Sequence, residues 1–201
     1  MKSAAVLVVA GAAFGSLASG AAAQENQNGC PEGTYSLALT EEGGTLTILF
    51  NNFVVELPDG QALARMTCRV HAPLNLPPDT SIGVYRVDYR GYAHLERQQN
   101  MELDVVYGFN DGRDHAFGRQ IRGAADEDYT FTQNIGAGLM RRVGCGETAA
   151  LDVEATITLN ANRQPGVALA TLDTYDGAPR GGLVYHFEFS RCAGGGGGTP
   201  R

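Results

Sequence analysis

An alternation of apolar and polar residues is the feature that most constrains what this chain can fold into. In the segment ALDVEATITL, apolar side chains occupy every second position from Leu151 to Leu159, and acidic residues or threonines stand between them. Successive side chains of a β-strand point to opposite faces, so this period of two predicts a strand with one buried face. The segment MELDVVYGF repeats the pattern from Met101 to Phe109.

Similar alternation recurs along most of the chain, and no segment stands out as a helix. The expected strands lie within residues 45–57, 66–74, 82–96, 101–109, 128–133, 139–143, 150–159, 167–172 and 183–191. Residues 113–126 are polar and contain glycines, so we expect them to form a long loop. About nine or ten strands joined by frequent turns predict an all-β fold, an antiparallel β-sandwich or jelly roll.

Three residue positions predict local geometry. The alternation changes phase at Asn51-Asn52, which indicates a β-bulge or a sharp bend. Pro73 cannot donate a hydrogen bond to a neighbouring strand, so its strand should lie at a sheet edge or break there. Gly91, inside an otherwise regular strand pattern, indicates a bulge or the close approach of another backbone.

The N-terminal segment has the features of a secretory signal peptide. Lys2 precedes an apolar run of small residues that ends in Ala21-Ala22-Ala23, a pattern that signal peptidase accepts. The mature protein is therefore expected to be extracellular or periplasmic, without a transmembrane segment. The predicted organisation is a signal peptide at 1–23, a polar lead-in at 24–29, a single β-sandwich domain at 30–192 and a flexible glycine-rich tail at 193–201.

The charge balance argues against nucleic acid as a partner. The chain has 15 basic and 22 acidic residues, and removal of Lys2 with the signal peptide changes its net charge from −7 to −8. Nucleic-acid binding depends on a basic surface that neutralises phosphates, and this chain lacks such an excess of basic residues.

The cysteines predict a disulfide-stabilised domain. The chain contains Cys30, Cys68, Cys145 and Cys192, an even number in a protein that we expect to be secreted, so two disulfides are expected. No CxxC pair occurs, which argues against a zinc or redox motif. Four cysteines allow three pairings, and we favour Cys30–Cys68 with Cys145–Cys192.

Several motifs occur in an order that is familiar from one family. They are GCPEGTYSLALT, TLTILFNNFVVE, the strand that follows Cys68, DYRGYAHL, Cys145-Gly146 and Cys192. Through these motifs, and Tyr-Arg-Gly-Tyr-Ala above all, residues 29–192 resemble a secreted family of bacteria and fungi, domain of unknown function 4360. The resemblance implies secretion, a β-rich fold and paired cysteines, and it implies no reaction. The chain departs from the family pattern in its lack of tryptophan before Cys145 and Cys192 and in His94.

The segment VDYRGYAHLE places five functional side chains on the outward face of one expected strand: Asp88, Arg90, Tyr92, His94 and Glu96. Alternate residues lie about 7 Å apart on such a face, so we expect the ion pairs Asp88–Arg90 and His94–Glu96. Arg90 and Tyr92 would present a guanidinium and a ring to a flat ligand such as a sugar. We predict Asp88, Arg90, Tyr92 and His94 as ligand-binding residues, although a solvated sheet face would show the same pattern.

Two acidic segments are candidates for holding Ca²⁺. DGRDHAFGR contains Asp111 and Asp114, and ADED contains Asp126 and Asp128. Carboxylate oxygens are the ligands that calcium prefers, but the spacing is not that of an EF-hand, and a solvated loop would have the same composition. We expect no other cofactor.

Catalytic patterns are sparse. No G-x-S-x-G motif occurs and all four cysteines are expected in disulfides, so a hydrolytic triad is not indicated. Two outward carboxylate pairs, Glu102 with Asp104 and Asp152 with Glu154, leave open an enzyme that acts on polysaccharide.

The sequence favours a secreted non-catalytic β-sandwich that binds a glycan or another surface. Two alternatives remain open: a polysaccharide-acting enzyme that uses outward carboxylates, and a structural envelope or inhibitor-like interaction protein. A polysaccharide or a surface protein is the expected partner in the first case. The ligand and the oligomeric state are not indicated by any motif.

Overall fold

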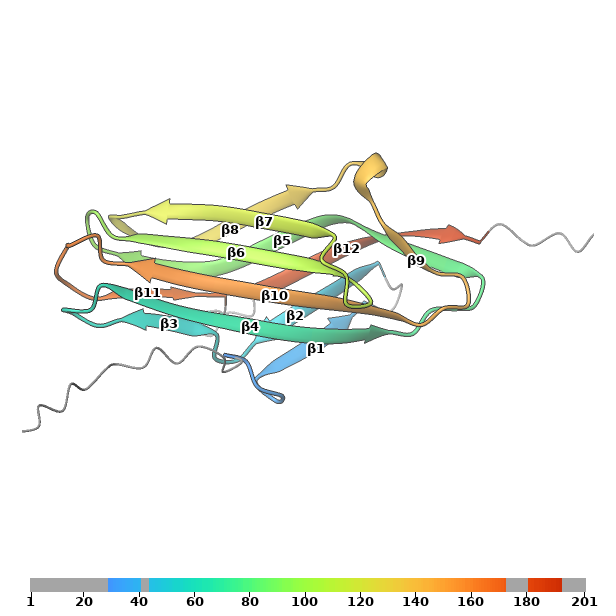
Figure 1. Cartoon of the computed structure of the whole chain (residues 1–201), viewed down its shortest axis with the longest axis horizontal. Helices are drawn as coiled ribbons and strands as arrows, with labels where there is room; N and C mark the ends of the chain where they lie inside the picture. Colours follow the sequence, from blue (N-terminus) through green and yellow to red (C-terminus); the bar gives the residue numbers. More distant parts are fainter. Residues whose placement is uncertain (1–28, 41–43, 173–180, 193–201) are drawn as a thin grey trace, which may run out of the picture.

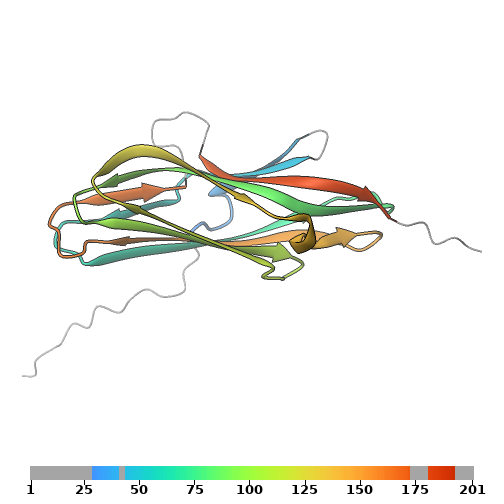
Figure 2. The same cartoon turned by 90° about the horizontal axis from the view of Figure 1, so that it is seen from above.

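The computed structural model describes residues 29–40, 44–172 and 181–192 and consists of two antiparallel β-sheets packed face to face (Figures 1 and 2). The predicted all-β sandwich is thereby confirmed, with twelve strands among the described residues rather than nine or ten. The larger sheet contains β1 (Tyr35–Leu39), β2 (Thr45–Phe50), β3 (Val54–Leu57), β5 (Thr80–Leu95), β8 (Ala125–Asn134), β9 (Arg142–Gly144), β11 (Ala168–Thr171) and β12 (Gly182–Arg191). The smaller sheet contains, in spatial order, β4 (Leu63–Leu74), β10 (Ala149–Asn160), β6 (Asn100–Phe109) and β7 (His115–Arg122).

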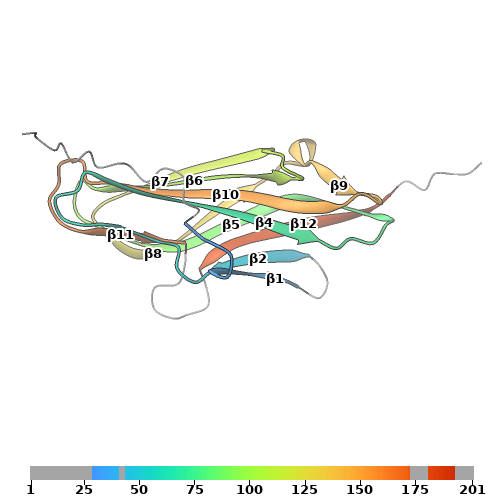
Figure 3. The same ribbon diagram turned by 60° about the horizontal axis from the view of Figure 1, so that its bottom comes forward.

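The strand β5 organises the larger sheet because it pairs with four other strands. β12 and then β11 pair along one of its edges, and β9 and then β8 pair along the other. β2 and β1 continue the sheet beyond β12, and β3 continues it beyond β11. Figure 3 shows β12, β2 and β1 side by side in that order. The segment VDYRGYAHLE therefore lies mostly within a central strand, with neighbours on both sides.

The core lies between the two sheets and contains the apolar side chains that the alternation predicts. Leu151, Leu159 and the apolar residues at every second position between them are buried. Tyr89 and Tyr107 are also fully buried, and each donates a hydrogen bond to Oε1 of Gln133, at 2.7 and 3.0 Å. Both hydroxyl groups are thus paired, as burial requires.

The prediction of a long loop at residues 113–126 is wrong. β7 and the start of β8 occupy most of this segment, and they pair with β6 and β5. β7 is an edge strand whose only buried side chain is that of Phe117, so no apolar alternation marks it in the sequence. Its backbone is held by inter-strand hydrogen bonds to β6, which depend little on side-chain type. A 3₁₀ turn at Ala137–Leu139 follows β8.

Two of the local predictions are confirmed. Pro73 lies in β4, an edge strand of the smaller sheet, and the strand continues past it to Leu74. The phase change at Asn51-Asn52 is a bend that separates β2 from β3. Because of this bend, Phe50 and Phe53 both face the core although an odd number of residue steps separates them.

The structure joins Cys30 to Cys68 and Cys145 to Cys192, the pairing that we favoured, with Cα–Cα distances of 5.1 and 5.6 Å.

The predicted signal peptide, residues 24–28 of the polar lead-in and the predicted glycine-rich tail lie outside the described residues. Within the described ranges, no helix is long and apolar enough to cross a membrane.

Candidate functional site

The outward face of β5 carries a buried carboxylate, Asp88, near its middle. The side chain of Asp88 points away from the core, yet it is only 2% exposed. Arg86 donates hydrogen bonds to both of its oxygens at 2.9–3.0 Å, and Thr132 donates one at 2.7 Å. His186 Nε2 lies 3.1 Å from Oδ2, and Arg90 Nη2 lies 3.8 Å from the same oxygen. The predicted Asp88–Arg90 pair is present, but it belongs to a larger cluster.

This cluster keeps Asp88 ionised. Burial alone would raise the pKa of the carboxyl, but hydrogen bonds from Thr132, Arg86 and His186 hold the pKa of Asp88 below its ordinary value. Both carboxylate oxygens already have partners on the protein. Asp88 is therefore suited to orient the arginines of this face, and a ligand would meet Arg90 before it met Asp88.

Replacing Asp88 with asparagine should lower the free energy of unfolding by about 2 kcal/mol at neutral pH, since hydrogen bonds to a charged group are lost. The folded-state pKa of Asp88 is depressed, so its contribution is complete above the unfolded-state pKa, about 4, and disappears as the pH falls through the folded-state value. Urea denaturation of both proteins should therefore show a stability gap that is constant from pH 5 to 7 and narrows below about pH 4. A stability difference between the two proteins that widens in acid would contradict the conclusion that Asp88 is ionised in the folded protein.

Further along β5, Tyr92 and His94 share one carboxylate of the neighbouring strand β8. Tyr92 Oη donates a hydrogen bond to Oδ1 of Asp126, and His94 Nδ1 lies 3.4 Å from the same oxygen. The hydrogen bonds from Tyr92 and His94 hold the pKa of Asp126 below its ordinary value, and the side chain is 69% exposed. Asp126 is thus an ionised, accessible acceptor at neutral pH. The predicted His94–Glu96 pair is wrong because β5 ends at Leu95 and the strand register places Asp126 opposite His94.

An open hollow of about 480 Å³ lies beside these three side chains. Its apolar walls come from the end of β3 and the start of β11, where Val167 is 55% exposed. Its volume falls within the range of small-molecule binding sites. The residues that line it are Glu56, Leu57, Pro58, Tyr92, His94, Asp126, Val167, Ala168 and Leu169.

Gly91 lies between Arg90 and Tyr92 and permits close packing on the inward side of β5. A Cβ atom at this position would lie 1.9 Å from the carbonyl oxygen of Thr171 and 2.6 Å from Oη of Tyr129. Tyr129 Oη donates a hydrogen bond to that same carbonyl at 2.6 Å. The pairing of β5 with β8 is regular at this point, so the close approach of another backbone, one of the two predicted alternatives, accounts for the glycine.

A second polar cluster lies on the outward face of the smaller sheet and contains one of the predicted carboxylate pairs. His71 Nδ1 lies 2.6 Å from Oδ1 of Asp152. Arg69 and Arg113 donate to the two oxygens of Glu154 at 2.9 and 3.3 Å. Burial alone would raise the pKa of Glu154, but these arginines hold it below its ordinary value. A general acid of glycoside hydrolysis needs a raised pKa, so Glu154 does not fit that role. The other predicted pair, Glu102 and Asp104, is exposed on β6.

The four aspartates predicted as metal ligands belong to two separate segments. Asp111 and Asp114 lie in the turn before β7, where Arg141 donates to Asp114 at 2.7 Å, and Asp126 and Asp128 lie on β8. Across residues 29–40, 44–172 and 181–192, no group of three or more His, Cys, Asp or Glu side chains is arranged to hold a metal ion. Calcium binding at any of these aspartates stays a prediction.

A family model described as a domain of unknown function, DUF4360, matches residues 21–192. The chain belongs to the DUF4360 family. The sequence motifs predicted this membership correctly. A relative from Arthroderma benhamiae, named "Uncharacterized secreted protein", is 25% identical over 167 residues, which cover 82% of this DUF4360 chain and 67% of the relative. The relative's name and the disulfide-bonded fold agree with the predicted secretion, which is thereby confirmed.

Among solved structures, the "Structure of infectious bursal disease virus Gx strain" contains a chain that aligns with this DUF4360 protein with a TM-score of 0.29 and 13% identity. The alignment covers 72% of this chain and 35% of the viral chain.

Several residues of this candidate site were not identified from the sequence. Arg86, Thr132 and His186 surround Asp88, and Pro58 and Val167 form the walls of the hollow. These residues lie on or beside strands that are distant in sequence, and no local pattern joins them. His186 has the outward parity in its expected strand, residues 183–191, but the register that brings it to Asp88 cannot be read from the sequence.

Proposed function

We propose that this DUF4360 protein is a non-catalytic secreted module that binds a glycan in the hollow beside Tyr92. One observation carries this proposal: an aromatic ring, apolar walls and carboxylates meet at one place on the outward face of a rigid sheet. The ring is that of Tyr92, the walls include Pro58 and Val167, and the carboxylates are those of Asp126 and Glu56.

This combination suits the amphipathic surface of a sugar. The C–H face of a sugar ring can pack on aromatic and aliphatic side chains, while its hydroxyl groups donate hydrogen bonds to carboxylate oxygens. Tyr92 is half-buried, and its hydrogen bond to Asp126 orients the ring before a ligand arrives. Such preorganisation reduces the entropy that is lost on binding.

Arg90, next to the hollow, extends the surface that a longer glycan would contact. Arg90 lies on the same face as Tyr92, about 7 Å away along the strand. Asp88 and its partners link β5 to β8 and β12 on this side of the sheet, and Arg90 itself remains 41% exposed. A chain of several sugars that starts in the hollow would therefore reach the Arg90 guanidinium next.

The pKa values of the nearby carboxyl groups support binding over catalysis. Retaining and inverting glycosidases both need one carboxyl group with a raised pKa to protonate the leaving oxygen. Asp88 and Asp126, on the outward face of the larger sheet, both have pKa values below their ordinary values. The exposed carboxylate of Asp126 is suited to accept hydrogen bonds from a ligand, which is the role that a binding module requires.

Replacing Tyr92 with alanine should weaken binding to the preferred polysaccharide about tenfold or more, because the ring is lost and Asp126 loses its anchor. The oxidised mature domain is incubated with insoluble cell-wall and storage polysaccharides, and the protein in the pellet and the sugar in the supernatant are measured. Wild type should enter the pellet of one or more polysaccharides without release of sugar. Tyr92→Phe, which keeps the ring, should retain more affinity than Tyr92→Ala.

Tyr85→Ala is the matched control. Tyr85 is a 42%-exposed tyrosine on the same strand, it does not line the hollow, and its ring centroid lies 6.0 Å from that of His186. This variant should pellet as the wild type does. Equal pelleting of Tyr92→Ala and wild type would refute the site, and release of sugar would refute the non-catalytic function.

A further inference from the structure

At the end of the molecule opposite the Tyr92 hollow, part of the inward face of the larger sheet is not covered by the smaller sheet. Leu37 and Leu39 on β1 pair with Ile48 and Leu46, whose side chains are buried, so all four have the inward orientation. Leu37 and Leu39 are nevertheless 38% and 51% exposed. Phe189, near the end of β12, is 41% exposed although it shares the orientation of the buried Phe187. The larger sheet extends beyond the smaller one here, and apolar side chains of core type remain accessible.

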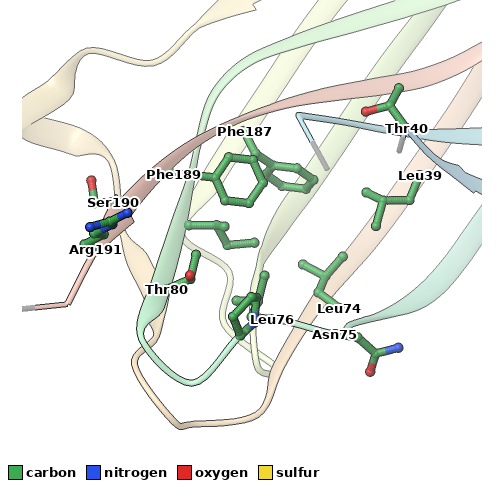
Figure 4. A pocket seen from close by; sticks show the side chains of 12 residues that line it. Leu39, Thr40, Leu74, Asn75, Leu76, Thr80, Phe187, Phe189, Ser190 and Arg191 are labelled. Carbon is green, nitrogen blue, oxygen red and sulfur yellow. The ribbon is translucent and has the colours of Figure 1, made fainter. Parts of the chain in front are cut away.

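Leu39 and Phe189 line an apolar groove of about 550 Å³ between β1, β12 and the segment that connects β4 to β5. Figure 4 shows Phe187 and Phe189 on one side, with Leu74 and Leu76 across from them and Leu39 at the upper rim. Ile82 completes the apolar lining. The volume falls within the range of sites for small ligands, and most of the lining is apolar.

The groove carries a positive charge at one end, although the protein as a whole is acidic. The chain is acidic, with a net charge of −7. Yet Arg191 is the one charged side chain among the described residues that line the groove, and within the described ranges it forms no ion pair. Figure 4 places Arg191 and Ser190 together at one end of the groove. An apolar groove with one guanidinium at its end, that of Arg191, is complementary to a molecule with an apolar tail and one anionic head.

We propose that this groove binds a single-chain amphiphile with a carboxylate head, such as a fatty acid. The tail lies along Leu39, Leu74 and the two phenylalanines, and the head pairs with Arg191, with Thr80, the residue opposite Arg191 in the sheet, beside it. A guanidinium can bind both oxygens of a carboxylate at once. Burial of the exposed parts of Leu39 and Phe189 supplies the apolar contribution to affinity.

This site is independent of the proposed glycan site. Ile82 and Tyr92 lie on the same strand, and ten residue steps at about 3.3 Å each separate them by about 30 Å. The two sites share no lining residue. Loss of one activity by mutation should therefore leave the other unchanged.

The test is isothermal titration calorimetry of the oxidised mature domain with dodecanoate below its micelle concentration. Dodecyl maltoside and dodecyltrimethylammonium, which have the same tail with a neutral or a cationic head, serve as comparison ligands. We expect one dodecanoate per protein, bound more tightly than either comparison ligand. Arg191→Gln should weaken dodecanoate binding about fivefold and leave maltoside binding unchanged, since a partly exposed ion pair contributes little more.

Phe189→Ala should weaken all three ligands about tenfold, because their common tail loses its contact. Arg97→Gln, at an exposed arginine in the turn after β5, is the matched control and should bind as the wild type does. The melting temperature of each variant shows whether it is folded. Dodecanoate that binds no better than the trimethylammonium ligand would overturn the proposal. So would unchanged binding by Phe189→Ala, or a dimer in sedimentation that Phe189→Ala dissociates, since a second copy would then cover the groove.

Discussion

Replacing Gly91 with alanine is expected to lower the free energy of unfolding by about 3 kcal/mol or more. The new methyl group would lie 1.9 Å from the carbonyl oxygen of Thr171, a distance that no rotamer change can relieve because the Cβ is fixed to the backbone. β11 would have to move away from β5. The buried hydrogen bond from Tyr129 to the Thr171 carbonyl, now 2.6 Å, would be strained or lost with that movement.

Gly118→Ala is the matched control for this prediction. Gly118 also lies in a strand, but it is exposed on the edge strand β7, and the nearest atom to a new Cβ is a carboxylate oxygen of Asp104 at 3.2 Å. That side chain can move, so the change should alter stability by less than about 1 kcal/mol. Urea denaturation of both variants makes the comparison. A Gly91→Ala protein as stable as Gly118→Ala would mean that β11 yields easily, and the glycine of the Tyr-Arg-Gly-Tyr-Ala motif would need another explanation.

Removal of the Cys145–Cys192 disulfide by a double substitution to alanine should cost about 4 kcal/mol on the loop-entropy model. The crosslink closes a loop of 47 residues, and it joins the end of β12 to the segment after β9. Phe189, Ser190 and Arg191 lie just before Cys192, so the same change should also loosen the apolar groove. The midpoint of urea denaturation and the affinity for dodecanoate should both fall.

The Cys30–Cys68 disulfide provides the comparison. It closes a loop of 38 residues, so the entropy model predicts a similar loss of about 4 kcal/mol. Its half-cystines do not line the groove, and dodecanoate affinity of the folded variant should be unchanged. Loss of groove affinity in both double variants, or in neither, would contradict the specific link between Cys192 and the groove.

The sequence contained enough information to predict the fold class and most strands, because one buried face imposes a period of two on each of them. The bend at Asn51-Asn52 could be predicted for the same reason, since a shift of phase requires the chain to turn. β7 could not be predicted, because Phe117 is its only buried side chain and an edge strand needs no apolar alternation. Backbone hydrogen bonds to β6 hold it in place, and these leave no trace in the side-chain pattern.

The site was only partly predictable. The outward position of Arg90, Tyr92 and His94 follows from parity along a single strand. The carboxylate that joins Tyr92 to His94 belongs to Asp126, on a strand about thirty residues later, and the register between β5 and β8 decides this pairing. Parity likewise placed Asp88 outward and therefore in solvent, whereas partners from β8 and β12 bury it.

The central claim is that a glycan occupies the hollow beside Tyr92, and a methyl-detected NMR titration tests it most directly. The oxidised domain, with labelled valine and leucine methyl groups, is titrated with soluble oligosaccharides of the polysaccharide that pellets it best. Shifts should concentrate at Val167, Leu169 and Leu57, and Leu39 and Leu74 in the distant groove should not respond. Shifts confined to the groove, or no shift with any oligosaccharide, would contradict the account.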